Sequence, residues 1–146
     1  MLWSALAMNT RMIVAIVGVI TVLLGLGGLL KPEWVMNLVG YAVASSAPAT
    51  LVRGEVRAVY GGMLIVAGAF TLLAAPDPRA NHGKLLLLGL LWIGTGAGRL
   101  FGIVVDGGPG VIGWLSLIVE FGGGGALLYA SQIGERAAIP SAPAGS

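Results

Sequence analysis

The sequence predicts an all-α integral membrane protein, a four-helix bundle with a short interfacial helix between the first two spans. Two observations carry this prediction. Of the 146 residues, 57% are hydrophobic and only 10% are charged, with a mean hydropathy of +0.95, whereas about a quarter of the residues in a soluble domain are charged. The apolar residues also gather in four segments of similar length, at about 12–30, 56–75, 85–105 and 111–131.

Each segment is close in length to the ~20 residues that an α-helix needs to cross a hydrocarbon core of ~30 Å. Glycines interrupt the segments, but glycine is common in membrane helices, whose backbone groups bond one another where water is absent. The connections are short, so residues 1–133 are expected to form one transmembrane domain. Residues 134–146, rich in Ala, Pro, Gly and Ser, are expected to form a flexible tail.

The first span is expected to begin after Arg11, because residues 1–10 are only weakly apolar and a charge commonly flanks a membrane helix. A secretory signal peptide is the alternative interpretation. However, the run 12–30 is 19 residues long, which exceeds the about 7–15 apolar residues of a signal peptide. No small-x-small cleavage site follows it, so a membrane span is the favoured interpretation.

A shorter helix is expected directly after the first span. Pro32 and Glu33 are a typical helix start, since proline suits the first helical position and an acidic side chain suits the first turn. The following residues place an apolar set on one side of this helix: Trp34, Val35, Leu38, Val39 and Ala42. Such a segment is expected to lie in the membrane interface, and residues 45–50 are expected to form a loop.

Short polar connections separate the other spans. The second span begins within the charged stretch Arg53–Gly62, and it ends at residues 74–79, where two prolines and an aspartate cannot continue a helix. Residues 106–110, Asp-Gly-Gly-Pro-Gly, are expected to form a tight turn between the third and fourth spans.

Basic residues near the ends of the spans predict the orientation, since lysine and arginine collect on the cytoplasmic side. One side would carry four basic residues: Arg11, Arg79, Lys84 and Arg136. The other side would carry two basic and two acidic residues: Lys31, Arg53, Glu33 and Asp106. Both termini are therefore expected to be cytoplasmic.

Ionisable groups within the spans are the strongest functional signal. Glu55 and Arg57 lie at the outer end of the second span. Arg99 lies six residues, ~9 Å, inside the third span, and Glu120 lies nine residues, ~14 Å, inside the fourth. A charge near the bilayer centre costs at least ~2.5 kcal/mol, so such groups are expected to face the bundle interior and to pair. Together these four side chains carry no net charge.

The first expected pair is Arg99 with Glu120, because their axial offset of ~5 Å lies within the reach of an arginine side chain. Arg57 can share Glu120 or Asp106, and Tyr60, one turn below Arg57, can add a hydroxyl to the same network. Two interpretations are open: the network fixes the register of the helices, or it binds an ion or a small ligand.

Glycines at short spacing predict close contacts between helices. Six are expected to pack: Gly61, Gly62, Gly94, Gly98, Gly102 and Gly124. Contact within one bundle is the simpler interpretation, and a face for a second copy or for another protein is the alternative. The run Gly122–Gly125 is not a phosphate loop, because it lacks the lysine and hydroxyl residue of such loops and lies inside an apolar span.

No catalytic residue, metal site or cofactor is predicted. Ser116 has no histidine within its span, His82 has no second type of metal ligand near it, and cysteine is absent. An acid or base role for Glu120 is the enzymatic alternative. The sequence has no basic patch of the kind that binds nucleic acid.

The sequence therefore predicts a small non-enzymatic membrane protein, an accessory or structural subunit that packs against a larger membrane complex or against itself. Its expected partners are the lipid bilayer and either a membrane protein or a second copy of the chain. The alternative is a binder or carrier of a small or lipid-like ligand that uses the intramembrane Arg, Glu and Tyr side chains.

Three features of the sequence point to a known family. The pattern Glu-x-Arg-x-x-Tyr-Gly-Gly stands at the entry to the second helix, an arginine lies late in the third and Glu120 lies in the fourth. The residues that match are Glu55, Arg57, Tyr60, Gly61, Gly62 and Arg99. On these residues the chain resembles, over nearly its whole length, a bacterial family of small four-helix integral membrane proteins classed as a domain of unknown function. The resemblance implies the four-helix architecture and the bacterial inner membrane, and it implies no activity.

Overall fold

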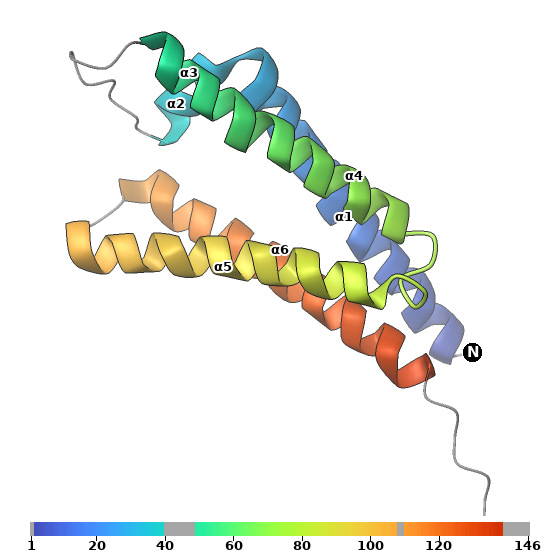
Figure 1. Ribbon diagram of the computed structural model, residues 1–146. Helices are drawn as coiled ribbons and strands as arrows, with labels where there is room; N and C mark the ends of the chain where they lie inside the picture. The colour runs from blue at the N-terminus through green and yellow to red at the C-terminus, as the bar shows by residue number, and fades with distance from the viewer. Residues whose placement is uncertain (1, 40–48, 108–109, 139–146) are drawn as a thin grey trace, which may run out of the picture.

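The computed structural model describes residues 2–39, 49–107 and 110–138, and within these ranges it contains helices and no strand. In chain order the elements are α1 (Leu2–Leu30), α2 (Pro32–Val39), α3 (Ala49–Val56), the π-helical segment η1 (Arg57–Met63), α4 (Leu64–Ala74), α5 (His82–Asp106) and α6 (Gly110–Ala138). The segments α3, η1 and α4 follow one another without a break and form one long helix (Figure 1).

Four helices are long and apolar enough to cross a membrane: Asn9–Leu30, Val52–Ala74, His82–Val105 and Gly110–Ile133. They coincide with the four segments that hydropathy indicates, and α2 stands between the first two spans as expected. The predicted fold class is therefore confirmed, and the chain is a multi-pass membrane protein with a helical bundle.

The helices extend beyond several predicted ends. Helix α1 begins at Leu2, because residues 2–11 contain no proline or glycine that would stop it. Residues 49 and 50, expected in a loop, belong to α3, and the rest of that loop lies outside the described residues. Helix α6 continues to Ala138, into the expected tail, since no proline lies between Gly110 and Pro140. The remainder of the tail also lies outside the described residues.

The helices form two antiparallel hairpins. Helix α1 packs along η1 and α4, and α5 packs along α6, whereas the contacts between the hairpins are fewer. The hairpins meet near the start of α1 and the α4–α5 connection, and they diverge toward the end where α2 lies (Figure 1). We call this second end the open end of the bundle.

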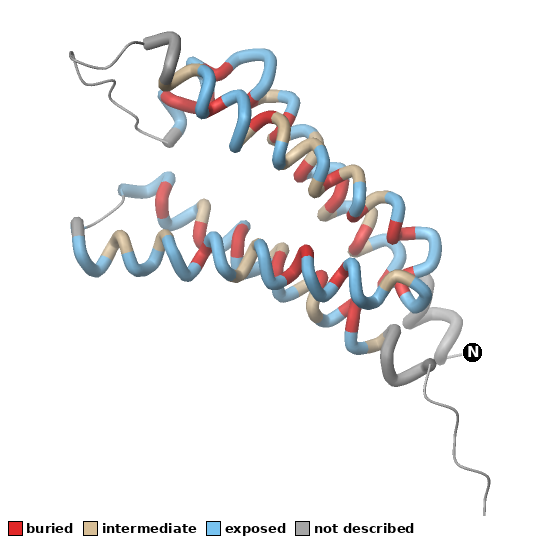
Figure 2. The backbone as a smooth tube through the Cα atoms, in the orientation of Figure 1, coloured by how far each residue is buried: buried red, intermediate tan, exposed pale blue. Residues whose placement is uncertain are grey.

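Burial follows this arrangement. The main core contains residues from all four spans, among them Val14, Ala74, Leu85 and Leu127, and a second cluster of Val35, Met36 and Val56 joins α2 to α3. Buried positions line the inner side of each hairpin, and the outward sides are exposed (Figure 2). The exposed side chains are largely apolar, as expected for helices that face lipid.

Glycines bring the two helices of each hairpin together. A Cβ added at Gly28 would collide with the backbone of Tyr60, and one at Gly68 would lie 2.7 Å from the backbone nitrogen of Val22. In the second hairpin, a Cβ at Gly89 would lie 3.1 Å from the carbonyl oxygen of Gly124. These contacts are backbone to backbone, so the helices can approach this closely only because the side chains are missing.

The glycines at the contacts repeat every seven residues, at Gly18 and Gly25, at Gly61 and Gly68, and at Gly89 and Gly96. A seven-residue repeat keeps one face toward a neighbouring helix at the small crossing angle typical of membrane bundles. Among the glycines expected to pack, Gly61 and Gly124 do so.

Gly94 and Gly98 are exposed, and an added Cβ would meet nothing within 4 Å at either. Both are two residues from Gly96, or about 200° around the helix, so they lie on the opposite face of α5. Gly62 and Gly102 are partly buried, and a Cβ at Gly62 would reach only the Arg57 carbonyl oxygen, at 3.9 Å.

Candidate functional site

The expected pair between Arg99 and Glu120 is present. Arg99 Nε donates to both carboxylate oxygens of Glu120 at 3.0 Å, and Nη2 donates to Oε1 at 2.6 Å. The Glu120 side chain is 6% exposed and the Arg99 side chain is 26% exposed. The carboxylate is therefore held from one side by a charged donor pair, while part of the guanidinium lies at the surface of the protein.

Close packing of α5 on α6 sets this geometry. A Cβ at Gly96 would lie 3.1 Å from the ring of Phe121, and one at Gly124 would lie 2.9 Å from Ile93. Gly96 is less than one turn from Arg99, and Gly124 is about one turn from Glu120. The glycines thus bring the two helices close enough for one arginine to span the gap between them.

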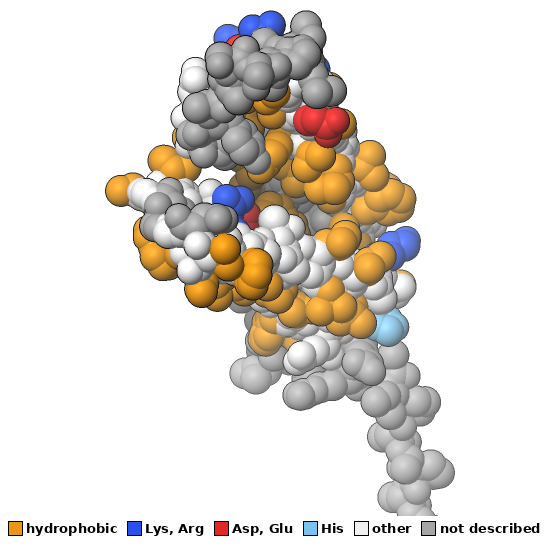
Figure 3. Space-filling view, turned by 60° about the vertical axis from the view of Figure 1, so that its left-hand side comes forward, with side chains coloured by type: hydrophobic (Ala, Val, Ile, Leu, Met, Phe, Trp, Pro, Cys, Tyr) orange, Lys and Arg blue, Asp and Glu red, His pale blue; other side chains and the backbone are white. Residues whose placement is uncertain are grey.

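Tyr60 connects this pair to the other hairpin. It lies in η1, is partly buried, packs against the Val35–Met36–Val56 cluster, and its side chain interacts electrostatically with the Arg99 guanidinium. In the space-filling view, a basic and an acidic side chain lie together between the two halves of the molecule (Figure 3). Arg99 therefore pairs with Glu120 within its own hairpin and lies within interaction range of Tyr60 across the bundle.

The π-helical geometry of η1 was not anticipated from the sequence. A π-helix inserts extra residues into a turn and changes which side chains face a neighbouring helix, and such segments are often found at functional sites. Here the segment Arg57–Met63 includes Tyr60 and Gly61, and it lies where Gly28 of α1 approaches the Tyr60 backbone. The signal in the sequence was the glycine pair at 61 and 62, which lowers the preference for a regular α-helix.

The other two candidate charges lie at the open end. Arg57 is exposed, and its Nε donates to the carbonyl oxygen of Leu29 at 3.3 Å. It therefore binds the end of α1 and makes no described ion pair with Glu120; the Asp106 side chain lies outside the described part of the chain. Glu55 is exposed beside a cavity of about 240 Å³ that Val52, Val59 and Tyr60 also line.

A second ion pair, which sequence reasoning missed, links Arg53 Nε to Glu33 Oε1 at 2.9 Å. Both side chains are about half exposed, so the pair contributes little to stability. It does join α2 to α3, two elements that hydropathy cannot place relative to each other. No group of three His, Asp or Glu side chains that could hold a metal occurs among the residues that the structure describes.

Residues 9–131 match the domain of unknown function DUF4345. The chain belongs to this family. The match confirms the resemblance that the Glu-x-Arg-x-x-Tyr-Gly-Gly pattern indicates. It covers the first three spans, all but the last two residues of the fourth, and every candidate residue of the charged site. No curated protein and no solved structure gave a significant match.

Membership of the DUF4345 family supplies no activity, so function must be argued from the site itself. The arrangement offers one buried carboxylate, one partly exposed guanidinium and one tyrosine hydroxyl, contributed by both hairpins. Such a set can brace the open end of the bundle, or it can present N–H donors to a molecule at the exposed part of Arg99.

Proposed function

We propose that this DUF4345 protein is a non-enzymatic membrane protein that works by helix association within the bilayer, first of all with a second copy of itself. The observation that supports this proposal is the outward face of α5. Gly94 and Gly98 lie there in open space, while the other glycines of the same helix that face α6 are already in close contact. Two exposed glycines at four-residue spacing make a smooth strip on which another helix can lie.

A further observation favours this face. Helix α5 has the smallest buried share of the four spans, 17% against 22–28% for the others. An uncharged small-residue strip is complementary to its own copy, as a two-fold dimer requires. The second copy is therefore the simplest occupant, and a larger membrane complex is the other.

We also propose the bacterial inner membrane, with both termini cytoplasmic, as the location. Helix α1 begins and α6 ends at the same end of the bundle (Figure 1). Arg11 lies near the start of the first span, and Arg79 and Lys84 lie at the α4–α5 connection. Basic residues on this side favour its placement in the cytoplasm.

Gly98→Leu tests the association face. We expect the variant to fold as the wild type does, because a Cβ at this position meets nothing within 4 Å, and to weaken self-association at least about ten-fold, because the leucine keeps the second helix away. Analytical ultracentrifugation in mild detergent measures the monomer–dimer equilibrium.

Gly122→Leu is the matched control, since Gly122 is also exposed in open space but lies on α6. A dimer that resists Gly98→Leu, or a wild type that remains monomeric without a partner, would contradict the proposal. If the chain is a monomer that co-purifies with another membrane protein through this face of α5, that protein, and not a second copy, is the partner.

A second candidate function is the binding of an amphiphile at the exposed part of Arg99. The partial exposure of its guanidinium favours this candidate, because Glu120 engages only the Nε and Nη2 groups of a side chain with five N–H donors. A molecule with an acceptor oxygen at its head and an apolar tail fits such a place within a membrane.

Tyr60→Phe distinguishes a ligand site from a brace. If an amphiphile is bound, we expect native mass spectrometry of the protein purified from membranes to show its bound fraction reduced about two- to ten-fold, because one hydroxyl is lost. Tyr129→Phe, on the exposed side of α6, is the control. If wild type carries no such molecule and Tyr60→Phe only lowers stability, by about 1 kcal/mol, the network is a brace.

A further inference from the structure

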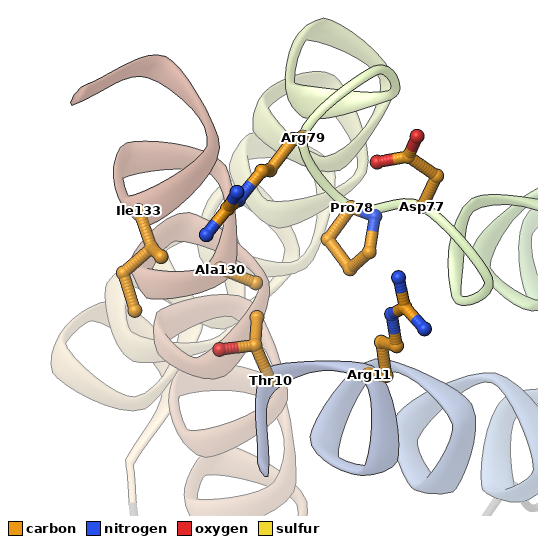
Figure 4. A pocket seen from close by; sticks show the side chains of 7 residues that line it. All are labelled: Thr10, Arg11, Asp77, Pro78, Arg79, Ala130 and Ile133. Atoms are coloured by element: carbon orange, nitrogen blue, oxygen red, sulfur yellow. The ribbon is translucent and has the colours of Figure 1, made fainter. Parts of the chain in front are cut away.

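A separate cavity of about 200 Å³ lies at the opposite end of the bundle from the charged pair. Three parts of the chain line it: Thr10 and Arg11 of α1, the connection between α4 and α5 with Asp77 and Arg79, and Ala130 and Ile133 of α6 (Figure 4). Its place is where the two hairpins meet, near the ends of the spans. The cavity is several times larger than the ~30 Å³ that one water occupies in the liquid.

The lining carries two arginines and one aspartate. Figure 4 shows the Arg79 side chain extended from the connection toward α6, while Arg11 rises from α1 toward Pro78 and Asp77. Neither arginine forms an ion pair with another described residue, since the described ion pairs are Arg99–Glu120 and Arg53–Glu33. The two guanidinium groups therefore bring up to ten N–H donors to one cavity.

Asp77 forms its hydrogen bonds within the α4–α5 connection. Asp77 Oδ1 accepts the backbone N–H of Ala80 at 3.1 Å, and the Asp77 carbonyl oxygen accepts the side-chain N–H of Asn81 at 2.9 Å. These bonds hold the turn that presents Arg79. The lining residues keep a net charge of +1, which favours an anion.

We propose that this cavity binds a phosphate group, with Arg11 and Arg79 as its ligands. Arginine recognises phosphate through paired, charge-assisted hydrogen bonds. The cavity lies at the level where phosphate groups of lipids end and hydrocarbon begins, because Arg11 is the third residue of the first span and Arg79 lies between two spans. The phosphate can belong to an anionic phospholipid or to a soluble phosphate compound.

Binding experiments on the full chain separate these two sources. The protein is placed in nanodiscs of phosphatidylcholine with or without phosphatidylglycerol, and retained lipid is counted by native mass spectrometry. In zwitterionic detergent, inorganic phosphate binding is measured by ³¹P NMR. Retention of phosphatidylglycerol without binding of inorganic phosphate identifies a lipid site, and binding of inorganic phosphate identifies a site for soluble phosphate.

Arg11→Gln and Arg79→Gln are each expected to lower the affinity about ten-fold or more. Both side chains are exposed, so the fold is expected to persist in these variants. Arg79→Lys keeps the charge but loses the paired donors of the guanidinium, so its affinity for phosphate should lie between those of the wild type and Arg79→Gln. Lys84→Gln is the control, because Lys84 lies nearby but binds Asn81 Oδ1 at 2.7 Å and does not line the cavity. Equal losses in Lys84→Gln, or no binding of either probe by wild type, would overturn the proposal.

Discussion

Replacing Glu120 by leucine is expected to lower the free energy of unfolding by about 3–5 kcal/mol, because it leaves the charge of Arg99 without its partner inside the membrane-spanning region. The carboxylate accepts three donor contacts from Arg99, all within 3.0 Å, and it is almost fully buried. Equilibrium unfolding in mixed detergent, followed by circular dichroism, measures the loss.

The double variant Arg99→Leu/Glu120→Leu shows whether the loss belongs to the pair. It is expected to recover most of the stability, because two apolar side chains need no compensation in the bilayer. Glu55→Leu is the control, since Glu55 is exposed and makes no ion pair with another described residue. A double variant as unstable as Glu120→Leu alone would mean that the carboxylate, and not the pair, holds the bundle together.

Gly28→Ala is expected to destabilise the first hairpin by about 1–3 kcal/mol. The added methyl group would collide with the carbonyl group of Tyr60 and with the backbone nitrogen of Gly61. These are backbone atoms, so no change of side-chain rotamer can relieve the collision. Helix α1 must then move away from η1. The shift would also displace Tyr60 from Arg99, so the variant is expected to loosen the open end of the bundle.

Gly62→Ala is the matched control for Gly28→Ala. Gly62 lies in the π-helical segment that Gly28 of α1 contacts, but its added Cβ would have only an ordinary contact at 3.9 Å. Since glycine weakens a helix relative to alanine by about 0.5–1 kcal/mol, Gly62→Ala is expected to be neutral or stabilising. Equal destabilisation of both variants in thermal unfolding would contradict a specific contact at Gly28.

The sequence was sufficient for the architecture and for the central pair. Apolar segments of membrane-spanning length leave few alternatives to helices, and the depth of Arg99 and Glu120 requires them to find partners. Both inferences rest on the large cost of exposing polar groups to hydrocarbon, which acts whatever the details of packing.

Contacts between helices were harder to predict. Four-residue glycine spacing pointed to Gly94 and Gly98, whereas the seven-residue spacing of Gly89 and Gly96 marks the face that packs on α6. Helix α5 carries glycines on both faces, and composition does not say which face turns inward. The π-helical segment around Tyr60 shifts the register again, and it lies where Gly28 of α1 approaches the Tyr60 backbone, a contact that cannot be predicted from the local sequence.

The division into two hairpins bears on how the chain enters the membrane during synthesis. Arg99 emerges from the ribosome before Glu120, so the third helix alone would carry an unneutralised arginine into the translocon, at a cost of about 2.5–3.5 kcal/mol. The partner that removes this cost lies on the very next helix, α6. The third and fourth helices are therefore suited to leave the translocon together, as an already neutral pair.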